Sequence, residues 1–129
     1  HQRVRPLQSL LGLWANDRGL EPVHAALVAH AGRGVLIAGR TGAGKSTVAL
    51  AALAAGYTYL GDDSVLFEIG SGGCIGHGLY ASVALEPEHA RRFPFLARHL
   101  VAPRADEPKA HALLSEPFRE RLAGRAAIA

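Results

Sequence analysis

The sequence contains a single cysteine, Cys74, and this scarcity excludes two classes of small protein. One thiol cannot form an intrachain disulfide framework, and it cannot supply the several cysteines of a Cys-based zinc site. A lone cysteine beside an aliphatic residue is more often a small buried hydrophobe than a reactive thiol. We therefore expect a protein of a reducing compartment, the cytoplasm.

Long apolar runs and a concentrated charge of one sign are lacking as well. No stretch approaches the about 18 uninterrupted apolar residues of a membrane-spanning helix, and the start shows no signal-peptide pattern. The formal net charge of +3 is spread along the chain, which is too diffuse for a nucleic-acid-binding surface. We expect neither a membrane nor a nucleic acid as a partner.

What the chain does contain is the composition of a folded protein. Hydrophobic residues make up 49% and charged residues 19% of its 129 residues, enough for one domain with a core. Because the chain begins at His1 rather than at a methionine, we expect residues 1–129 to be a single domain of a longer protein. No linker or internal repeat divides it.

Hydrophobic periodicity predicts a mixture of helices and strands, which indicates an α/β fold. Apolar residues at 7, 10, 11 and 14 have the spacing of a helix that lies on a core. The later pattern predicts the following segments: strands at 24–31, 35–38, 57–60 and 65–69, turns at 32–34 and 70–73, a β segment at 74–85, helices at 45–55 and 86–96, and a loop at 101–110.

A glycine-rich loop joins the predicted strand 35–38 to the predicted helix 45–55. Lys45 and Ser46 end a match to the pattern G-x-x-x-x-G-K-[ST], in which backbone N–H groups and the lysine bind phosphates and the hydroxyl binds Mg²⁺. The pattern does not distinguish ATP from GTP. We predict that ATP and Mg²⁺ bind to the loop residues Gly39, Arg40, Thr41, Gly42, Ala43, Gly44, Lys45 and Ser46 and to Thr47.

Two acidic residues, Asp62 and Asp63, follow the next predicted strand, 17 and 18 residues after Lys45. Ligands of open α/β sheets bind outside the carboxyl ends of the strands, so this pair would face the phosphates. One carboxylate could bind the metal, and the other could accept a proton from an attacking hydroxyl. The alternative is a polar turn, because aspartate favours turns.

His24 begins the strand-like run that precedes the glycine loop. A neutral imidazole there could hydrogen-bond an aspartate and tune its basicity. A packed or surface histidine is the alternative, because the chain has seven histidines. The remaining histidines show no ligand-like spacing, and we assign them no role.

Together these residues resemble the HPr serine kinase/phosphorylase family and its shorter relatives, some of which phosphorylate lasso-peptide precursors. The resemblance covers about Glu21 to Val65: a histidine, a glycine loop and an Asp-Asp pair in the order of the family. It implies a phosphoenolpyruvate-carboxykinase-like nucleotide-binding fold with a mixed, strongly curved sheet. By position, Asp63 matches the aspartate that takes the proton from the acceptor serine, His24 matches the active-site histidine, and Asp62 would support the metal with Ser46.

The sequence departs from the family after the Asp-Asp pair. The full family carries a Glu-x-Arg-Gly-Leu-Gly-Ile signature with a metal-binding glutamate, and the nearest counterpart here, Cys74 to Tyr80, has neither the Glu nor the Arg. The leading hypothesis is an ATP–Mg²⁺-dependent kinase that transfers the γ-phosphoryl group to a hydroxyl, a serine, of a peptide or small protein. Two alternatives stay open, a non-catalytic nucleotide-binding regulatory module and an NTP hydrolase. The apolar N-terminal helix could also pack on a second copy in a homo-oligomer.

Overall fold

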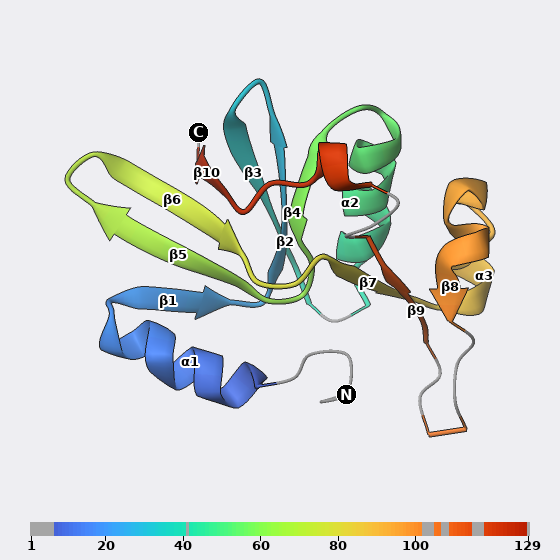
Figure 1. Ribbon diagram of the computed structural model, residues 1–129, viewed down its shortest axis with the longest axis horizontal. Coiled ribbons are helices and arrows are strands. Elements are labelled where there is room, and N and C mark those ends of the chain that lie inside the picture. Colours follow the sequence, from blue (N-terminus) through green and yellow to red (C-terminus); the bar gives the residue numbers. More distant parts are fainter. Residues whose placement is uncertain (1–6, 41, 102–104, 107–108, 115–117, 129) are drawn as a thin grey trace.

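The computed structural model describes residues 7–40, 42–101, 105–106, 109–114 and 118–128. Within these residues the chain forms a seven-stranded mixed sheet and a smaller sheet of three strands (Figure 1). The mixed α/β class expected from the sequence is therefore confirmed. No helix in the described part of the chain is long and apolar enough to cross a membrane.

The helices and strands follow one another along the chain in this order: α1 (Gln8–Asp17), β1 (Leu20–Val23), β2 (Ala25–His30), β3 (Arg33–Ala38), α2 (Lys45–Ala54), β4 (Thr58–Gly61), β5 (Val65–Gly70), β6 (Gly73–Gly78), β7 (Ser82–Leu85), α3 (Pro87–Ala90), the 3-10 helix η1 (Pro94–His99), β8 (Leu100–Val101), β9 (Ala110–Leu113), the 3-10 helix η2 (Arg119–Arg121) and β10 (Arg125–Ile128).

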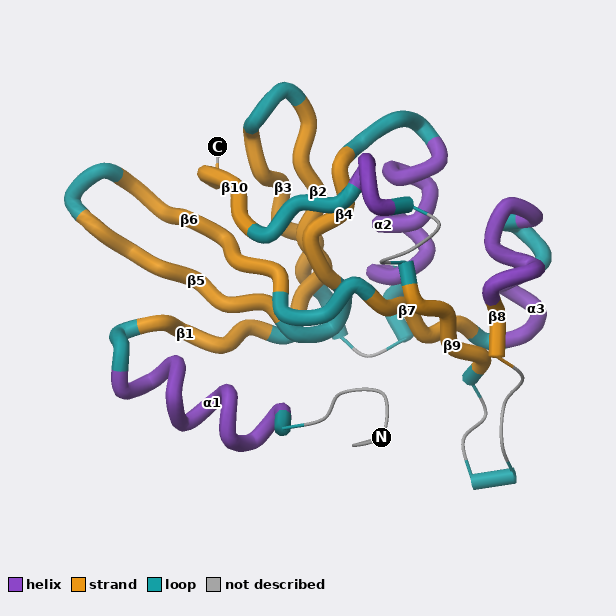
Figure 2. Tube along the Cα trace, in the orientation of Figure 1, coloured by secondary structure: helices purple, strands orange, loops and turns teal. Residues whose placement is uncertain are grey.

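The larger sheet has the order β1-β5-β6-β10-β3-β2-β4. Strand β2 lies between β3 and β4 and is antiparallel to both, so β3 and β4 run in the same direction. Their carboxyl ends consequently meet at one edge of the sheet, beside the beginning of β2. Figure 2 shows α2 packed next to these strands, with the second sheet, β7-β9-β8, on the other side of the helix.

The core is divided in two because successive side chains of β2 point to opposite faces of the sheet. Ala26 and Val28 face a cluster that includes Leu50 and Leu53 of α2 and extends into the second sheet. Leu27 faces a second, smaller cluster on the opposite face of the large sheet. Because the first cluster joins α2 to both sheets, packing of this core fixes the smaller sheet beside the loop that begins α2.

The N-terminal helix is present as predicted, but its orientation is not the expected one. Leu7, Leu10 and Trp14 belong to the predicted apolar stripe, yet they are 64%, 61% and 46% exposed. The helix instead buries Ala15 and contacts β1. The expectation that the stripe lies on the core is wrong, because a narrower face with a small side chain allows the helix to approach β1.

The second half of the chain differs most from the sequence-based prediction. Residues 74–85 form two strands in different sheets, β6 and β7, rather than one segment. The helix expected at 86–96 is also wrong in extent, because α3 ends at Ala90 and Pro94 starts a separate 3-10 helix. A proline lacks the N–H group that would continue a helix and disfavours helical geometry in the residue before it. The sequence also gave no indication of β1, β9 and β10, and β3 begins inside the turn expected at 32–34.

Candidate functional site

The glycine loop connects the end of β3 to the first residue of α2, as the sequence predicts. Gly42 and Gly44 have φ angles of 83° and 91°, a left-handed conformation that side chains with a Cβ rarely adopt. Gly44 is the N-cap of α2, and no side chain caps the helix. The first N–H groups of α2 are therefore directed at the loop, where they can bind an anion. Thr41, also predicted to bind nucleotide, lies outside the described residues.

Lys45 spans the loop from the start of α2. Its Nζ donates hydrogen bonds to the carbonyl oxygens of Gly39 at 2.8 Å and Arg40 at 2.9 Å, and the residue is 8% exposed. The N–H of Ala43 also donates to the carbonyl of Arg40 at 3.0 Å. These bonds hold the loop closed around the ammonium group, so a positive charge lies at the centre of the predicted phosphate site.

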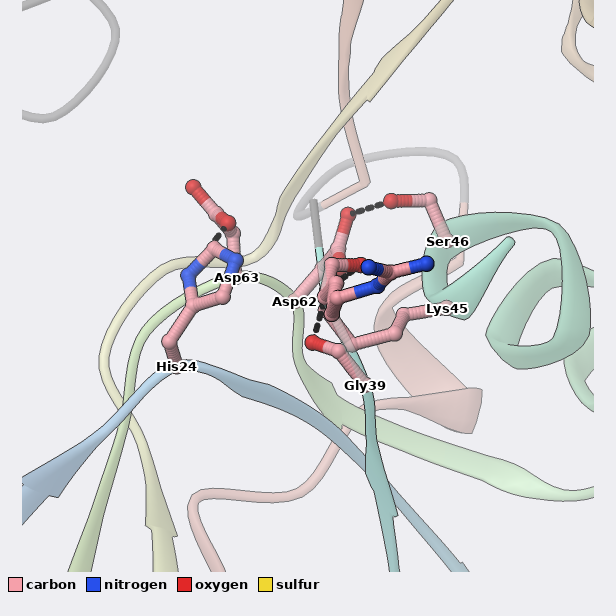
Figure 3. Close-up of polar contacts among 7 residues, drawn as sticks. His24, Gly39, Lys45, Ser46, Asp62 and Asp63 are labelled. Atoms are coloured by element: carbon pink, nitrogen blue, oxygen red, sulfur yellow. Dashed lines mark hydrogen bonds and ion pairs between the residues drawn. The ribbon is translucent and has the colours of Figure 1, made fainter. Parts of the chain in front are cut away.

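Ser46 and Asp62 form the second contact of the site (Figure 3). The Ser46 Oγ donates a hydrogen bond of 2.7 Å to Asp62 Oδ2, and Asp62 is 1% exposed at the carboxyl end of β4. These oxygens are chemically suitable ligands for Mg²⁺, and neighbouring ligands of an octahedral Mg²⁺ ion lie about 2.9 Å apart. The residues present therefore fit the predicted metal. Among the described residues, no group of three or more His, Cys, Asp or Glu side chains is arranged to hold a metal ion.

His24 and Asp63 form a separate pair (Figure 3). The Nδ1 of His24 lies 2.8 Å from Asp63 Oδ1, and the two side chains are 48% and 26% exposed. The backbone of Asp63 has a φ of 67°, in the left-handed region that aspartate tolerates better than most residues. Such strain is often found at functional sites. Here it turns the carboxylate of Asp63 toward the imidazole, whereas that of Asp62 meets Ser46.

The pairing of β2 with its neighbours explains why these residues converge. The register pairs Ala25 with Ala38 of β3, so His24 precedes β2 at the point where the glycine loop leaves β3. On the other side, Leu27 pairs with Gly61, the last residue of β4. The start of β2 and the carboxyl ends of β3 and β4 therefore meet at the same edge of the sheet.

A cleft of about 170 Å³ contains Ser46, from the first pair, and both His24 and Asp63. Five of the residues predicted to bind nucleotide line it, whereas Gly39, Arg40 and Ala43 contribute the hydrogen bonds within the loop. The cleft also contains five residues from the smaller sheet and its surroundings for which the sequence pattern gave no role. The full lining is His24, Gly42, Gly44, Lys45, Ser46, Thr47, Asp63, Ala84, Leu85, Glu86, His89 and Lys109.

The stretch from Cys74 to Tyr80, which was compared above with the signature of HPr kinases, forms most of β6 and has a packing role. A Cβ added to Gly78 would lie 1.8 Å from the carbonyl oxygen of Leu60 in β4. Only glycine allows the two backbones to approach so closely. Gly78 therefore supports the strand that presents Asp62.

The fold has a counterpart among solved structures. The structure of the HPr(Ser) kinase/phosphatase from Coxiella burnetii matches with a TM-score of 0.54 at 18% sequence identity. The match covers 84% of this chain and 61% of that one, so the chain spans about three-fifths of the length of that protein. At this identity the likeness shows a similarity of fold alone, a mixed α/β architecture. No protein-family model matches the sequence, and no curated protein matches it.

Proposed function

We propose that this chain binds ATP with Mg²⁺ and transfers the γ-phosphoryl group to a serine hydroxyl of a peptide or small protein, such as a peptide natural-product precursor. The observation that carries the proposal is the single cleft that contains both the start of α2 and the His24–Asp63 pair. Such a cleft can bring together a phosphate donor and a hydroxyl acceptor. The kinase-like fold supports the same reaction class.

The glycine loop would bind the donor. The N–H groups at the start of α2 would receive phosphate oxygens, and Lys45 would neutralise the charge of the β- and γ-phosphates. Ser46 and Asp62 would hold Mg²⁺, which would supply positive charge to offset the negative charge of the phosphates. Since these residues would contact only the phosphates and the metal, the nucleobase, adenine or guanine, would have to be recognised by other residues.

The pair of His24 and Asp63 would act on the acceptor. Asp63 would accept the proton of the serine hydroxyl while the serine oxygen forms a bond to the γ-phosphorus. At the same time the bond between the γ-phosphorus and the β,γ-bridging oxygen would break, and ADP would leave. His24 contacts one carboxylate oxygen, and the other oxygen extends away from the imidazole (Figure 3). The contact therefore supports an assignment of Asp63 as the base and of His24 as the residue that orients it.

Nucleotide turnover measured with and without serine-containing peptides tests the proposal. The full chain is incubated with ATP and Mg²⁺, ADP release is followed by a coupled assay, and the peptides are examined by mass spectrometry for an added phosphate. We expect ADP release that depends on a peptide and a matching phosphopeptide. Turnover that is independent of any peptide would instead indicate an NTP hydrolase, and tight binding without turnover would indicate a regulatory module.

A further inference from the structure

The cleft is also lined by ionisable residues that the proposed reaction does not use. These residues are Glu86, His89 and Lys109. They come from α3 and from the ends of strands β7 and β9 in the smaller sheet, not from the segment between β3 and α2. A ligand bound to the loop within this cleft would therefore also lie near these side chains.

Strand pairing explains the position of Lys109. Strands β7 and β9 are antiparallel, and their register includes the pair Leu85 and Ala110. Glu86 follows Leu85 and Lys109 precedes Ala110, so these oppositely charged residues leave the sheet side by side. Lys109 is half-buried, whereas Glu86 is exposed. The lysine is thus the more enclosed of the two, and the adjoining strand anchors its backbone.

The cleft contains two lysines, and they have different surroundings. Lys45 already donates hydrogen bonds to the carbonyls of Gly39 and Arg40, which fix it within the loop. Lys109 reaches the same cleft from the other sheet. During phosphoryl transfer the oxygens of the transferred group carry negative charge, and a cation outside the loop can stabilise that charge strongly.

The phosphoryl end of a nucleotide is the part that fits this cleft. Pockets that enclose a whole drug-sized ligand have volumes of about 300–1,000 Å³, and this cleft measures about 170 Å³. It also contains Asp63, the proposed base, which has to lie where the acceptor hydroxyl meets the γ-phosphorus. The ligand group between Lys45 and Lys109 is therefore the γ-phosphoryl group rather than the nucleoside.

We propose that Lys109 binds the γ-phosphoryl group from the side of the smaller sheet and stabilises its charge during transfer. This inference rests on the proposed function, because it takes a nucleoside triphosphate as the ligand of the cleft. A purely structural role makes a different prediction. If Lys109 served only to pair with Glu86, neutralising either residue would change the binding of all nucleotides to the same extent.

Binding measurements with two nucleotides test the contact without requiring transfer. The affinities of the full chain for Mg²⁺·ADP and for the non-hydrolysable triphosphate analogue Mg²⁺·AMP-PNP are measured by isothermal titration calorimetry. We expect Lys109→Met to weaken the analogue about 10-fold, the loss of one charge-assisted hydrogen bond, and to change ADP affinity less than about 2-fold. Lys109→Arg retains the charge and should keep most of the affinity for the analogue.

Three further variants make the result interpretable. Lys109→Gln keeps a polar side chain and is measured in parallel, so the test does not depend on the folding of one variant. Glu86→Gln removes the neighbouring charge, and we expect it not to reproduce the loss of triphosphate affinity. Arg33→Met is the matched control, because Arg33 is exposed at the end of β3 opposite the glycine loop.

The outcomes separate this inference from the proposed function. Equal losses for both nucleotides, no loss for either, or the same selective loss in Glu86→Gln would each overturn the contact with Lys109. If the wild-type chain phosphorylates no peptide but Lys109→Met still loses triphosphate affinity selectively, the kinase assignment fails and the contact stands. If the wild-type chain binds neither nucleotide, both fail.

Discussion

Replacing Gly78 with alanine should damage both the stability of the fold and the metal site. The new Cβ would lie 1.8 Å from the Leu60 carbonyl oxygen, and real Cβ contacts are essentially never shorter than 3.0 Å, so the strands must separate by at least 1.2 Å there. The obstacle is backbone rather than a flexible side chain, so we expect the upper end of the usual overpacking range, about 3 kcal/mol of unfolding free energy. Asp62 follows Leu60 by two residues. The same displacement should therefore disrupt its 2.7 Å hydrogen bond with Ser46.

Urea unfolding followed by circular dichroism measures the first effect, and Mg²⁺-dependent nucleotide affinity measures the second. Gly72→Ala is the matched control, because a Cβ at Gly72 in the β5–β6 turn meets nothing within 4 Å and the residue is not in the left-handed region. We expect the control to lie within about 0.5 kcal/mol of the wild type. A Gly78→Ala variant that is as stable as the wild type would refute the close approach of β6 and β4.

Two substitutions separate the roles of the acidic pair. Asp62→Asn keeps the shape of the side chain but removes the charge beside Ser46, so the Mg²⁺ concentration needed for ATP binding should rise about 10- to 100-fold. The control Glu68→Gln, on the exposed part of β5, should leave this Mg²⁺ concentration unchanged. If Asp62→Asn needs no more Mg²⁺ than the wild type, Asp62 is not part of the metal site. His24→Gln loses the 2.8 Å contact with Asp63. The rate of phosphate transfer should then fall about 10- to 100-fold, while the affinity for ATP stays constant. The control His30→Gln, at the other end of β2, should change neither quantity. If His24→Gln loses ATP affinity as well as transfer rate, His24 supports the fold instead.

The part of the site that the sequence predicts is the part specified by local chain geometry. The glycines, Lys45 and Ser46 lie in one strand–loop–helix segment, and Asp62 and Asp63 directly follow a strand. Their linear pattern therefore contains most of their spatial arrangement. The position of His24 depends in addition on the antiparallel pairing of β2, which no local pattern in the sequence specifies.

The smaller sheet was not predictable in the same way. In β9 the inward residues are Ala110 and Ala112, whereas Leu113 is 66% exposed, so the large apolar residue points away from the core. Leu113 therefore departs from the usual strand pattern, in which the large apolar residues face inward. Lys109 precedes this strand in a stretch with prolines and charges, and only the pairing of β9 with β7 brings it to the cleft. The missing information is long-range pairing, which no local propensity contains.

The exposed face of α1 illustrates a further limit of pattern reasoning. Periodicity identifies the helix and its apolar stripe correctly, but it cannot state what the stripe contacts. In this chain Leu10 and Trp14 remain largely exposed while Ala15 is buried. Packing of the stripe on a second copy of the chain stays a prediction, and measurement of the molar mass in solution would test it.

The Asp63→Asn variant shows whether Asp63 is the base of a phosphoryl transfer reaction. The substitution preserves the shape of the side chain and removes its ability to take a proton. With an acceptor peptide at saturating ATP and Mg²⁺, we predict a fall in the transfer rate of about 100- to 10,000-fold, while ATP affinity changes less than about 3-fold. Transfer by Asp63→Asn at the wild-type rate would show that Asp63 is not the base.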